Sequence, residues 1–141
     1  MTNVADGDGA DGGAPSRQWG EHLGAFYEAA AVCPLLGPEG QPVTPEAVLE
    51  RTDLLALTTG SGQVIYPAFQ FRGRRLVPGL DRVLAELPES VVSRWTLSSW
   101  LVSPERDLGG DRPIDVLFDQ GPAGVDAVVH AARAWAAQLE G

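Results

Sequence analysis

The sequence predicts a mainly α-helical fold, a small helical domain with one β-hairpin. Residues 80–87 and 125–139 carry apolar side chains at the spacing of one face of a helix. Between residues 54 and 71, two β-prone runs flank Gly60-Ser-Gly62, and a three-residue loop that contains glycine is typical of a hairpin. Glycine and proline interrupt the rest of the chain at short intervals, so we expect its helices to be short.

The 141 residues are enough for one domain, or for one domain with a small N-terminal extension. Residues 1–18 are rich in Gly, Asp, Ala and Ser without hydrophobic periodicity, which predicts a disordered tail. We expect a helix-turn-helix-like unit with the β-hairpin over residues 19–75. A helical C-terminal domain should follow over residues 76–141.

The N-terminal unit should begin with a helix from Trp19 to about Val32, before a stretch broken by proline and glycine. Thr44-Pro-Glu46 predicts the start of a second helix, because threonine caps, proline suits the first position and glutamate favours the positive end of the helix dipole. That helix should end near Thr52. Pro67 lacks a donor N–H, so we expect it at a sheet edge or a bulge. Arg72-Gly-Arg-Arg75 should form a polar turn.

In the C-terminal half, Pro88 should end the helix over residues 80–87, and a second helix is predicted over residues 91–102. A short turn or helix should then lead to Gly109-Gly110. Arg112 is the predicted N-cap of the next helix, with Pro113 in its first position, because a residue before proline avoids helical angles. Gly121-Pro122 separates this piece from the last helix.

The composition excludes several chemistries. The net charge is −9, which argues against a broad nucleic-acid surface because phosphates require clustered cations. The chain contains no lysine, so neither a P-loop nor a Schiff base can form. Its one cysteine, Cys33, indicates a reducing compartment. With no signal-peptide pattern and no long apolar run, we expect a cytoplasmic protein without membrane contact.

Candidate catalytic and metal-binding groups are few. His22 and His130 lie in no recognisable motif, and Cys33 is best interpreted as a small buried apolar side chain. Zinc requires four clustered ligands that the chain does not supply in a standard set. The sequence therefore predicts no catalytic residues, no metal and no cofactor. An enzyme built on a carboxylate pair is the least supported alternative.

DNA binding is the stronger alternative. Helix, turn, helix and hairpin over residues 19–71 is the order of a winged helix-turn-helix, with residues 45–52 as its recognition helix. Such a helix should carry side chains that read base edges, but this one offers Arg51 beside two glutamates. Arg72, Arg74 and Arg75 are the remaining candidates for contacts with the phosphate backbone.

A resemblance to a known family follows from the C-terminal half. Its elements are Trp100-Leu-Val-Ser-Pro104, then Leu108-Gly-Gly-Asp-Arg-Pro-Ile-Asp-Val-Leu117, then Gly121 and a final helix of small residues. Residues 91–132 resemble the toxin-binding domain of the MbcA/ParS/Xre-type antitoxins. The family often has asparagine after Ser-Pro, where this chain has Glu105.

The resemblance implies an antitoxin whose C-terminal domain covers the active-site entrance of a RES-domain toxin that degrades NAD. NAD would then be the partner's substrate and not a cofactor of this chain. The resemblance also implies a homo-oligomer or a hetero-oligomer with the toxin, and repression of the protein's own promoter. The tryptophans of this half suit either the core or an anchor in a partner's pocket. The partner-binding residues it implies are Trp100, Ser103, Leu108, Gly109, Gly110, Arg112, Pro113, Ile114, Asp115 and Leu117.

Overall fold

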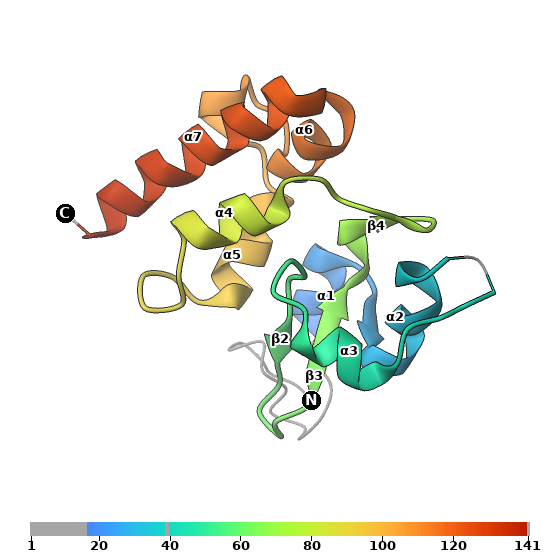
Figure 1. Ribbon diagram of the computed structural model, residues 1–141. Coiled ribbons are helices and arrows are strands. Elements are labelled where there is room, and N and C mark those ends of the chain that lie inside the picture. Colours follow the sequence, from blue (N-terminus) through green and yellow to red (C-terminus); the bar gives the residue numbers. More distant parts are fainter. Residues whose placement is uncertain (1–16, 39, 141) are drawn as a thin grey trace. The chain divides into compact units, whose positions relative to one another are not determined.

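The computed structural model describes residues 17–38 and 40–140, and the chain divides into two compact units, residues 1–76 and 77–141 (Figure 1). The predicted class, mainly α-helical with a β-hairpin, is confirmed. Of the predicted disordered tail, residues 1–16 lie outside the described residues. The last two residues assigned to that tail, Arg17 and Gln18, instead begin the first helix.

The predicted helix from residue 19 to about 32 is wrong, because the structure divides this stretch into three elements. Helix α1 (Arg17–Leu23) ends at Gly24, whose φ of +86° is left-handed and whose N–H donates to the Gly20 carbonyl at 2.8 Å. Strand β1 (Phe26–Glu28) follows, and helix α2 (Ala29–Leu36) begins directly after it. Glycine permits the left-handed turn that lets residues 26–28 leave the helix and join a sheet.

Helix α3 (Pro45–Glu50) packs against α2 in unit 1. Its predicted start is confirmed, since Thr44 Oγ1 accepts a hydrogen bond from the Ala47 N–H at 3.1 Å and Pro45 is the first helical residue. It ends at Glu50, two residues earlier than expected. Residues 37–44 connect α2 to α3. This connection is longer than the turn of three or four residues in a helix-turn-helix.

The predicted hairpin forms from β2 (Leu57–Thr58) and β3 (Val64–Pro67), which pair antiparallel. Thr59 and Gln63 close the Gly60–Gly62 loop through an N–H to carbonyl bond of 2.9 Å, and Gly62 has a φ of +89°. Strand β1 also pairs antiparallel with β3, so the sheet has the order β1-β3-β2.

Pro67 lies on the central strand β3, but β2 pairs only with Val64 and Ile65, so at Pro67 one side of β3 is an edge, as the sequence predicts. Pro67 is its last residue and pairs with Phe26. The Ala68 N–H donates to the Ala25 carbonyl at 2.9 Å, so the bond to β1 next to Pro67 comes from residue 68, and the nitrogen of Pro67 is directed to the side where β2 does not pair. The chain then enters the 3₁₀-helix η1 (Ala68–Gln70).

The predicted polar turn over residues 72–75 is the tip of a second hairpin in unit 1. Strands β4 (Phe71–Arg72) and β5 (Arg75–Leu76) pair antiparallel, and Gly73 adopts a φ of +61° between them. Six buried side chains of unit 1 form a hydrophobic cluster: Val32, Cys33, Val48, Leu54, Tyr66 and Phe71.

Unit 2 is helical, with α4 (Leu80–Glu86), α5 (Arg94–Leu101), η2 (Arg106–Leu108), α6 (Pro113–Asp119) and α7 (Gly121–Glu140). Pro88 lies just beyond α4, as predicted. The α5 helix starts three residues later than expected, because Ser93 caps it through a 3.1 Å bond from the Thr96 N–H. The predicted N-cap Arg112 and first residue Pro113 of α6 are confirmed.

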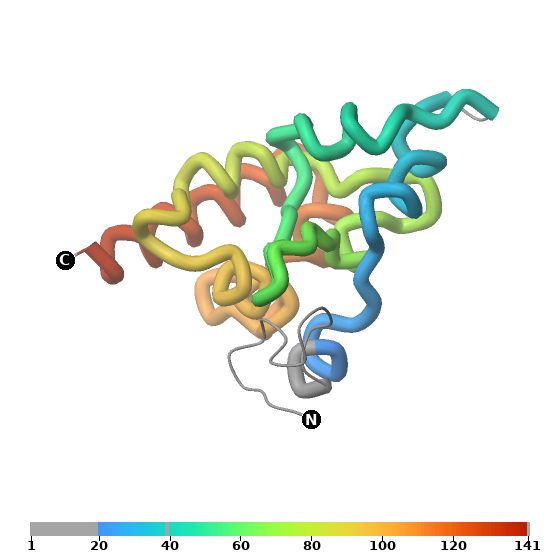
Figure 2. The backbone as a smooth tube through the Cα atoms, turned by 90° about the horizontal axis from the view of Figure 1, so that it is seen from below, coloured from blue at the N-terminus to red at the C-terminus, as the bar shows by residue number. Residues whose placement is uncertain are grey.

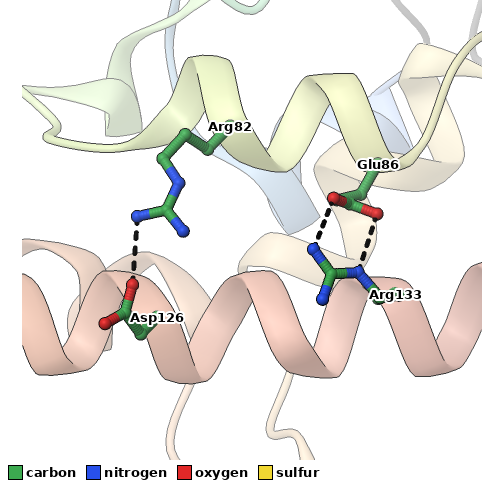
Figure 3. Close-up of polar contacts among 4 residues, drawn as sticks. All are labelled: Arg82, Glu86, Asp126 and Arg133. Atoms are coloured by element: carbon green, nitrogen blue, oxygen red, sulfur yellow. Dashed lines mark hydrogen bonds and ion pairs between the residues drawn. The ribbon is translucent and has the colours of Figure 1, made fainter.

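Helix α7 packs against α6, α4 and η2, and both backbone views show α4 alongside α7 (Figures 1 and 2). Two exposed ion pairs join α4 to α7 (Figure 3): Arg82 with Asp126 at 3.0 Å and Glu86 with Arg133 at 2.9 Å. At the other helix contact, a Cβ on Gly124 would lie 2.6 Å from the Val116 carbonyl oxygen. The small residue therefore allows α7 to approach α6 closely.

Candidate protein-binding surface

The loop between α5 and α6, residues 102–112, is folded around the backbone of Glu105. The Glu105 N–H donates to the Asp111 carbonyl at 3.1 Å, and the Glu105 carbonyl accepts from the N–H groups of Leu108 at 3.0 Å and Gly110 at 2.9 Å. Gly109 and Gly110 have φ values of +71° and +90°, a conformation that side chains with a Cβ disfavour. The two glycines of the motif are thus required by the turn itself.

The carboxylate of Glu105 ties this loop to α5. Its Oε1 accepts a 2.8 Å hydrogen bond from the indole N–H of Trp100, and its Oε2 accepts a 2.8 Å bond from the Asp107 N–H. Both N–H groups donate to the same carboxylate, and hydrogen bonds to a charged acceptor are stronger than those between neutral groups. Glu105 therefore fixes the orientation of the Trp100 ring and the start of η2.

Trp100 stacks on Trp135 of α7, with ring centroids 5.3 Å apart and an interplanar angle of 21°. Both side chains are only half-buried. Stacked aromatic pairs contribute about 0.5–1.5 kcal/mol beyond the area that they bury. The pair thus holds the C-terminal part of α7 against the end of α5 and still presents aromatic surface to the solvent.

Beside this pair lies a hollow of about 590 Å³. Helices α5 and α7 and the loop around η2 contribute its walls. Ala131 is small and buried, which leaves space at the level of the rings, and the polar side chains form the rim. The lining residues, which we call the tryptophan hollow, are Trp100, Glu105, Arg106, Asp107, Ala131, Trp135 and Gln138.

The structure separates the predicted partner-binding residues into core and surface. Ile114 and Leu117 are 3% and 0% exposed, and Pro113 is also buried. The α6 helix uses these three side chains to pack inside unit 2. In this fold they support the surface and present no area of their own to a partner.

The remaining predicted residues lie at or near the surface. Trp100 lines the tryptophan hollow, whereas Ser103 donates to the Ser99 carbonyl at 2.7 Å and thereby closes the end of α5. Leu108 is half-buried, and Gly109 and Gly110 form the exposed turn. These residues shape the loop whose neighbouring side chains line the hollow.

Arg112 and Asp115 form a two-pronged ion pair at the start of α6, with N–O distances of 2.8 and 3.1 Å. The hydrogen bond with Asp115 raises the pKa of the Arg112 guanidinium, which stays charged in any case. Both side chains are partly exposed. Arg112 is therefore the N-cap residue of α6 by its backbone position, and its side chain pairs with Asp115 where a partner can reach it.

Sequence reasoning missed most of the tryptophan hollow. Of its lining residues, only Trp100 is among the predicted partner-binding residues. Ala131, Trp135 and Gln138 lie on α7, beyond residues 100–117, and the other three lie within that range but were not among the predicted residues. The sequence left Trp135 either in the core or as an anchor in a partner's pocket, and the spacing of the last helix placed it on the packed face. Hydrophobic periodicity indicates which face of a helix packs against the rest of the protein. It does not indicate how far along the helix that packing extends.

The arginines proposed for DNA contact are engaged within unit 1. Arg51 pairs with Asp53 through bonds of 2.7 and 2.6 Å, and hydrogen bonding by Arg51 lowers the pKa of that carboxyl. Arg74 donates to the carbonyl oxygens of Pro34 and Gly37. Arg72 and Arg75 flank the tip of the second hairpin and also have intramolecular interactions. Among the described residues, these arginines therefore form no cluster of unpaired cations at α3.

The candidate catalytic groups lie on separate elements of the described chain, residues 17–38 and 40–140. No group of three or more His, Cys, Asp or Glu side chains in this part of the chain is placed to hold a metal ion. His22 lies on α1 and His130 on α7, both exposed, and buried Cys33 donates to the Ala29 carbonyl. Within the same residues, no helix is long and apolar enough to cross a membrane.

Comparisons of the chain with protein-family models, with curated proteins and with solved structures found no match. The class that the fold defines is therefore a mainly α-helical protein of two compact units, with a candidate interaction surface on the second.

Proposed function

We propose that this chain is an antitoxin, a cytoplasmic protein that binds a cognate toxin through unit 2 and blocks its active site. The partner that we propose is a RES-domain toxin that degrades NAD. The motif over residues 100–117, which resembles the MbcA/ParS/Xre-type antitoxins, supports this choice of partner. The tryptophan hollow supports the choice of surface.

The single observation that carries the proposal is the half-exposed Trp100–Trp135 stack beside the motif loop. Tryptophan and arginine are enriched among the residues that contribute most to protein–protein binding. Here the two tryptophans are held in place by helix packing and by Glu105. A surface fixed before binding loses less conformational entropy when the partner arrives.

The proposal is tested by co-expressing this chain with the product of the adjacent open reading frame. We expect a complex that co-purifies, together with relief of the growth arrest and NAD loss that the neighbour causes alone. A neighbour that is harmless and does not bind would reject the antitoxin function. Light scattering of the purified complex would give its stoichiometry, which we expect to be multimeric.

Single substitutions locate the binding surface. Trp135→Ala should weaken the complex by at least about 30-fold, the effect of losing a central aromatic contact. Leu49→Ala is the matched control, because Leu49 is 53% exposed on α3 of unit 1 and should not contribute. Circular dichroism must show that both variants are folded. Equal affinity of the two variants would place the toxin elsewhere on the chain.

DNA binding by unit 1 is a second candidate function, and one observation favours it. The pair α2 and α3 is followed by the β2–β3 hairpin, in the element order of a winged helix-turn-helix. The six residues of α3 include Glu46 and Glu50, which oppose a phosphate backbone. A gel-shift assay with the DNA upstream of the gene tests this function. If the protein binds that DNA no more tightly than unrelated DNA at moderate salt, DNA binding is rejected.

A further inference from the structure

The tryptophan hollow combines aromatic faces with carboxylates. The face of an indole ring carries negative charge in its π system and attracts cations, and tryptophan does so best among the aromatic residues. Trp100 is held with its N–H edge on Glu105, and Trp135 stacks on it. The exposed aromatic surface in the hollow is therefore suited to a positive group.

The charges around the hollow also favour a positively charged occupant. Glu105 and Asp107 lie on its rim, and the exposed Asp111 follows in the same loop. Among the described residues, the Asp107 carboxylate has neither a hydrogen-bond nor an ion-pair partner. Glu105 uses one site on each oxygen internally, and a carboxylate has about four such sites. Both groups can therefore accept bonds from a ligand.

The charges of unit 2 as a whole add to this field. Residues 77–141 contain ten acidic residues and five arginines. Four of those arginines are paired with carboxylates, at Asp126, Glu89, Asp115 and Glu86. Arg106 is the remaining arginine, and it lies on the rim of the hollow, where it opposes a cation. The surface should therefore attract a basic partner segment and repel an acidic one.

We propose that the tryptophan hollow binds a cationic side chain, an arginine or a lysine, from a basic segment of the partner protein. An arginine guanidinium stacks flat on an aromatic face while its edge donates to a carboxylate, which matches an indole beside Asp107. This proposal rests on the proposed function for the identity of the partner. The preference of the hollow for a cationic side chain does not depend on that identity.

The direct test measures peptide binding by the whole chain. Capped peptides Gly-Gly-Xaa-Gly-Gly-Xaa-Gly-Gly, in which Xaa is arginine, leucine or glutamate, are titrated against protein labelled with ¹⁵N. The readout is the indole N–H resonances of Trp100 and Trp135. The arginine peptide should shift both and bind most tightly, and its affinity should fall with added salt.

Two substitutions of opposite sign make the test specific. Asp107→Asn should weaken binding of the arginine peptide by about two- to fivefold, the effect of one exposed ion pair. Arg106→Gln should strengthen it by a similar factor, because it removes the opposing cation. Asp81→Asn, the same charge change at an exposed position of α4, should leave it unchanged.

Trp135→Leu separates aromatic from apolar recognition. It keeps an apolar side chain on α7 and removes the ring face, so it should weaken the arginine peptide and leave any binding of the leucine peptide unaltered. Equal or tighter binding of the leucine or glutamate peptide, or no shift with the arginine peptide, overturns the proposal.

The two proposals fail separately. If the toxin complex forms but Asp107→Asn and Arg106→Gln both leave its affinity unchanged, the cation site is wrong and the antitoxin function stands. If the arginine peptide binds as described but the neighbouring protein does not, the hollow recognises basic segments and the proposed partner is wrong.

Discussion

The carboxylate of Glu105 accepts the indole N–H of Trp100 at 2.8 Å, so the motif loop and the tryptophan stack form one connected structure. Its second oxygen holds the Asp107 N–H at the same distance. The surface proposed for partner binding is therefore organised by a residue that the motif itself did not single out. The position and the ring orientation of Trp100 both depend on this one acidic side chain.

Glu105→Gln should loosen the loop. A glutamine oxygen can still accept from Trp100, but its NH₂ group would face the Asp107 N–H and cannot accept from it. We expect unfolding to become easier by about 1–2 kcal/mol, since hydrogen bonds to charged groups contribute about 1.5–3 kcal/mol. Hydrogen exchange of the Asp107 amide is the specific readout, and it should become faster.

The control for this variant is Asp111→Asn, which removes the same charge from an exposed side chain of the same loop. It should leave amide exchange at Asp107 unchanged. If Glu105→Gln also leaves it unchanged, the carboxylate does not organise the loop.

Gln70 stabilises unit 1 in a comparable way, from a fully buried position. Its side-chain amide pairs with the backbone of Leu55 as a strand would, with Oε1 accepting from the N–H and Nε2 donating to the carbonyl, both at 2.9 Å. Nε2 also donates to the Pro67 carbonyl at 3.0 Å. Gln70→Leu would leave these buried groups unsatisfied, at about 1–3 kcal/mol for each.

We therefore expect Gln70→Leu to lower the free energy of unfolding by at least about 2 kcal/mol in urea denaturation. Gln41→Leu makes the same exchange at an exposed position of unit 1 and should change it by less than about 0.5 kcal/mol. If the two variants are equally stable, the Gln70 bridge contributes nothing to the fold.

Gly124 should not tolerate alanine, although alanine normally favours a helix over glycine by about 1 kcal/mol. A Cβ there would lie 2.6 Å from both the Val116 carbonyl oxygen and the Cβ of Gln120. Backbone must move to relieve that contact, so Gly124→Ala should destabilise the protein by about 1–3 kcal/mol in thermal unfolding.

The comparison for this variant is Gly20→Ala in α1, where an added Cβ meets nothing within 4 Å. That variant should be neutral or slightly more stable, by up to about 1 kcal/mol. A Gly124→Ala protein as stable as Gly20→Ala would mean that α6 and α7 separate without cost.

The sequence predicted the helical part of this fold well, because apolar spacing and proline positions are local signals. Pro88 beyond α4 and Pro113 at the start of α6 needed no tertiary information. The sequence did not predict the β1 strand, because the spacing of residues 26–28 fits a continuing helix. They form a strand through their pairing with β3, which is distant in sequence. Gly24 was the local signal for that break.

The candidate site was predictable only in part, for a related reason. The loop of glycines and Arg112 is encoded within a few consecutive residues. The hollow arises where Trp135 on α7 meets Trp100 on α5, residues separated by 35 positions. Periodicity assigns each tryptophan to a covered face, but whether a ring is half-exposed depends on how far the neighbouring element extends.

The Glu86–Arg133 pair between α4 and α7 predicts how stability depends on pH (Figure 3). The hydrogen bond from Arg133 lowers the pKa of Glu86 from its ordinary value of 4.5, with smaller contributions from the charges of Arg133 and Arg82. A carboxyl whose pKa is lower in the folded state stabilises the fold above its unfolded pKa. That stabilisation is lost as the pH falls through the folded pKa.

Glu86→Gln should therefore lower the melting temperature at about pH 7, and its difference from the unmodified protein should shrink as the pH falls through the lowered pKa of Glu86. The effect should be small and should shrink in about 1 M salt, because Arg133 is 64% exposed. Arg133→Gln removes the same pair from the other side, so the double variant should be no less stable than Arg133→Gln alone. A Glu86→Gln difference that stays the same as the pH falls through the acidic range would show that the side chain acts through packing and not through its charge.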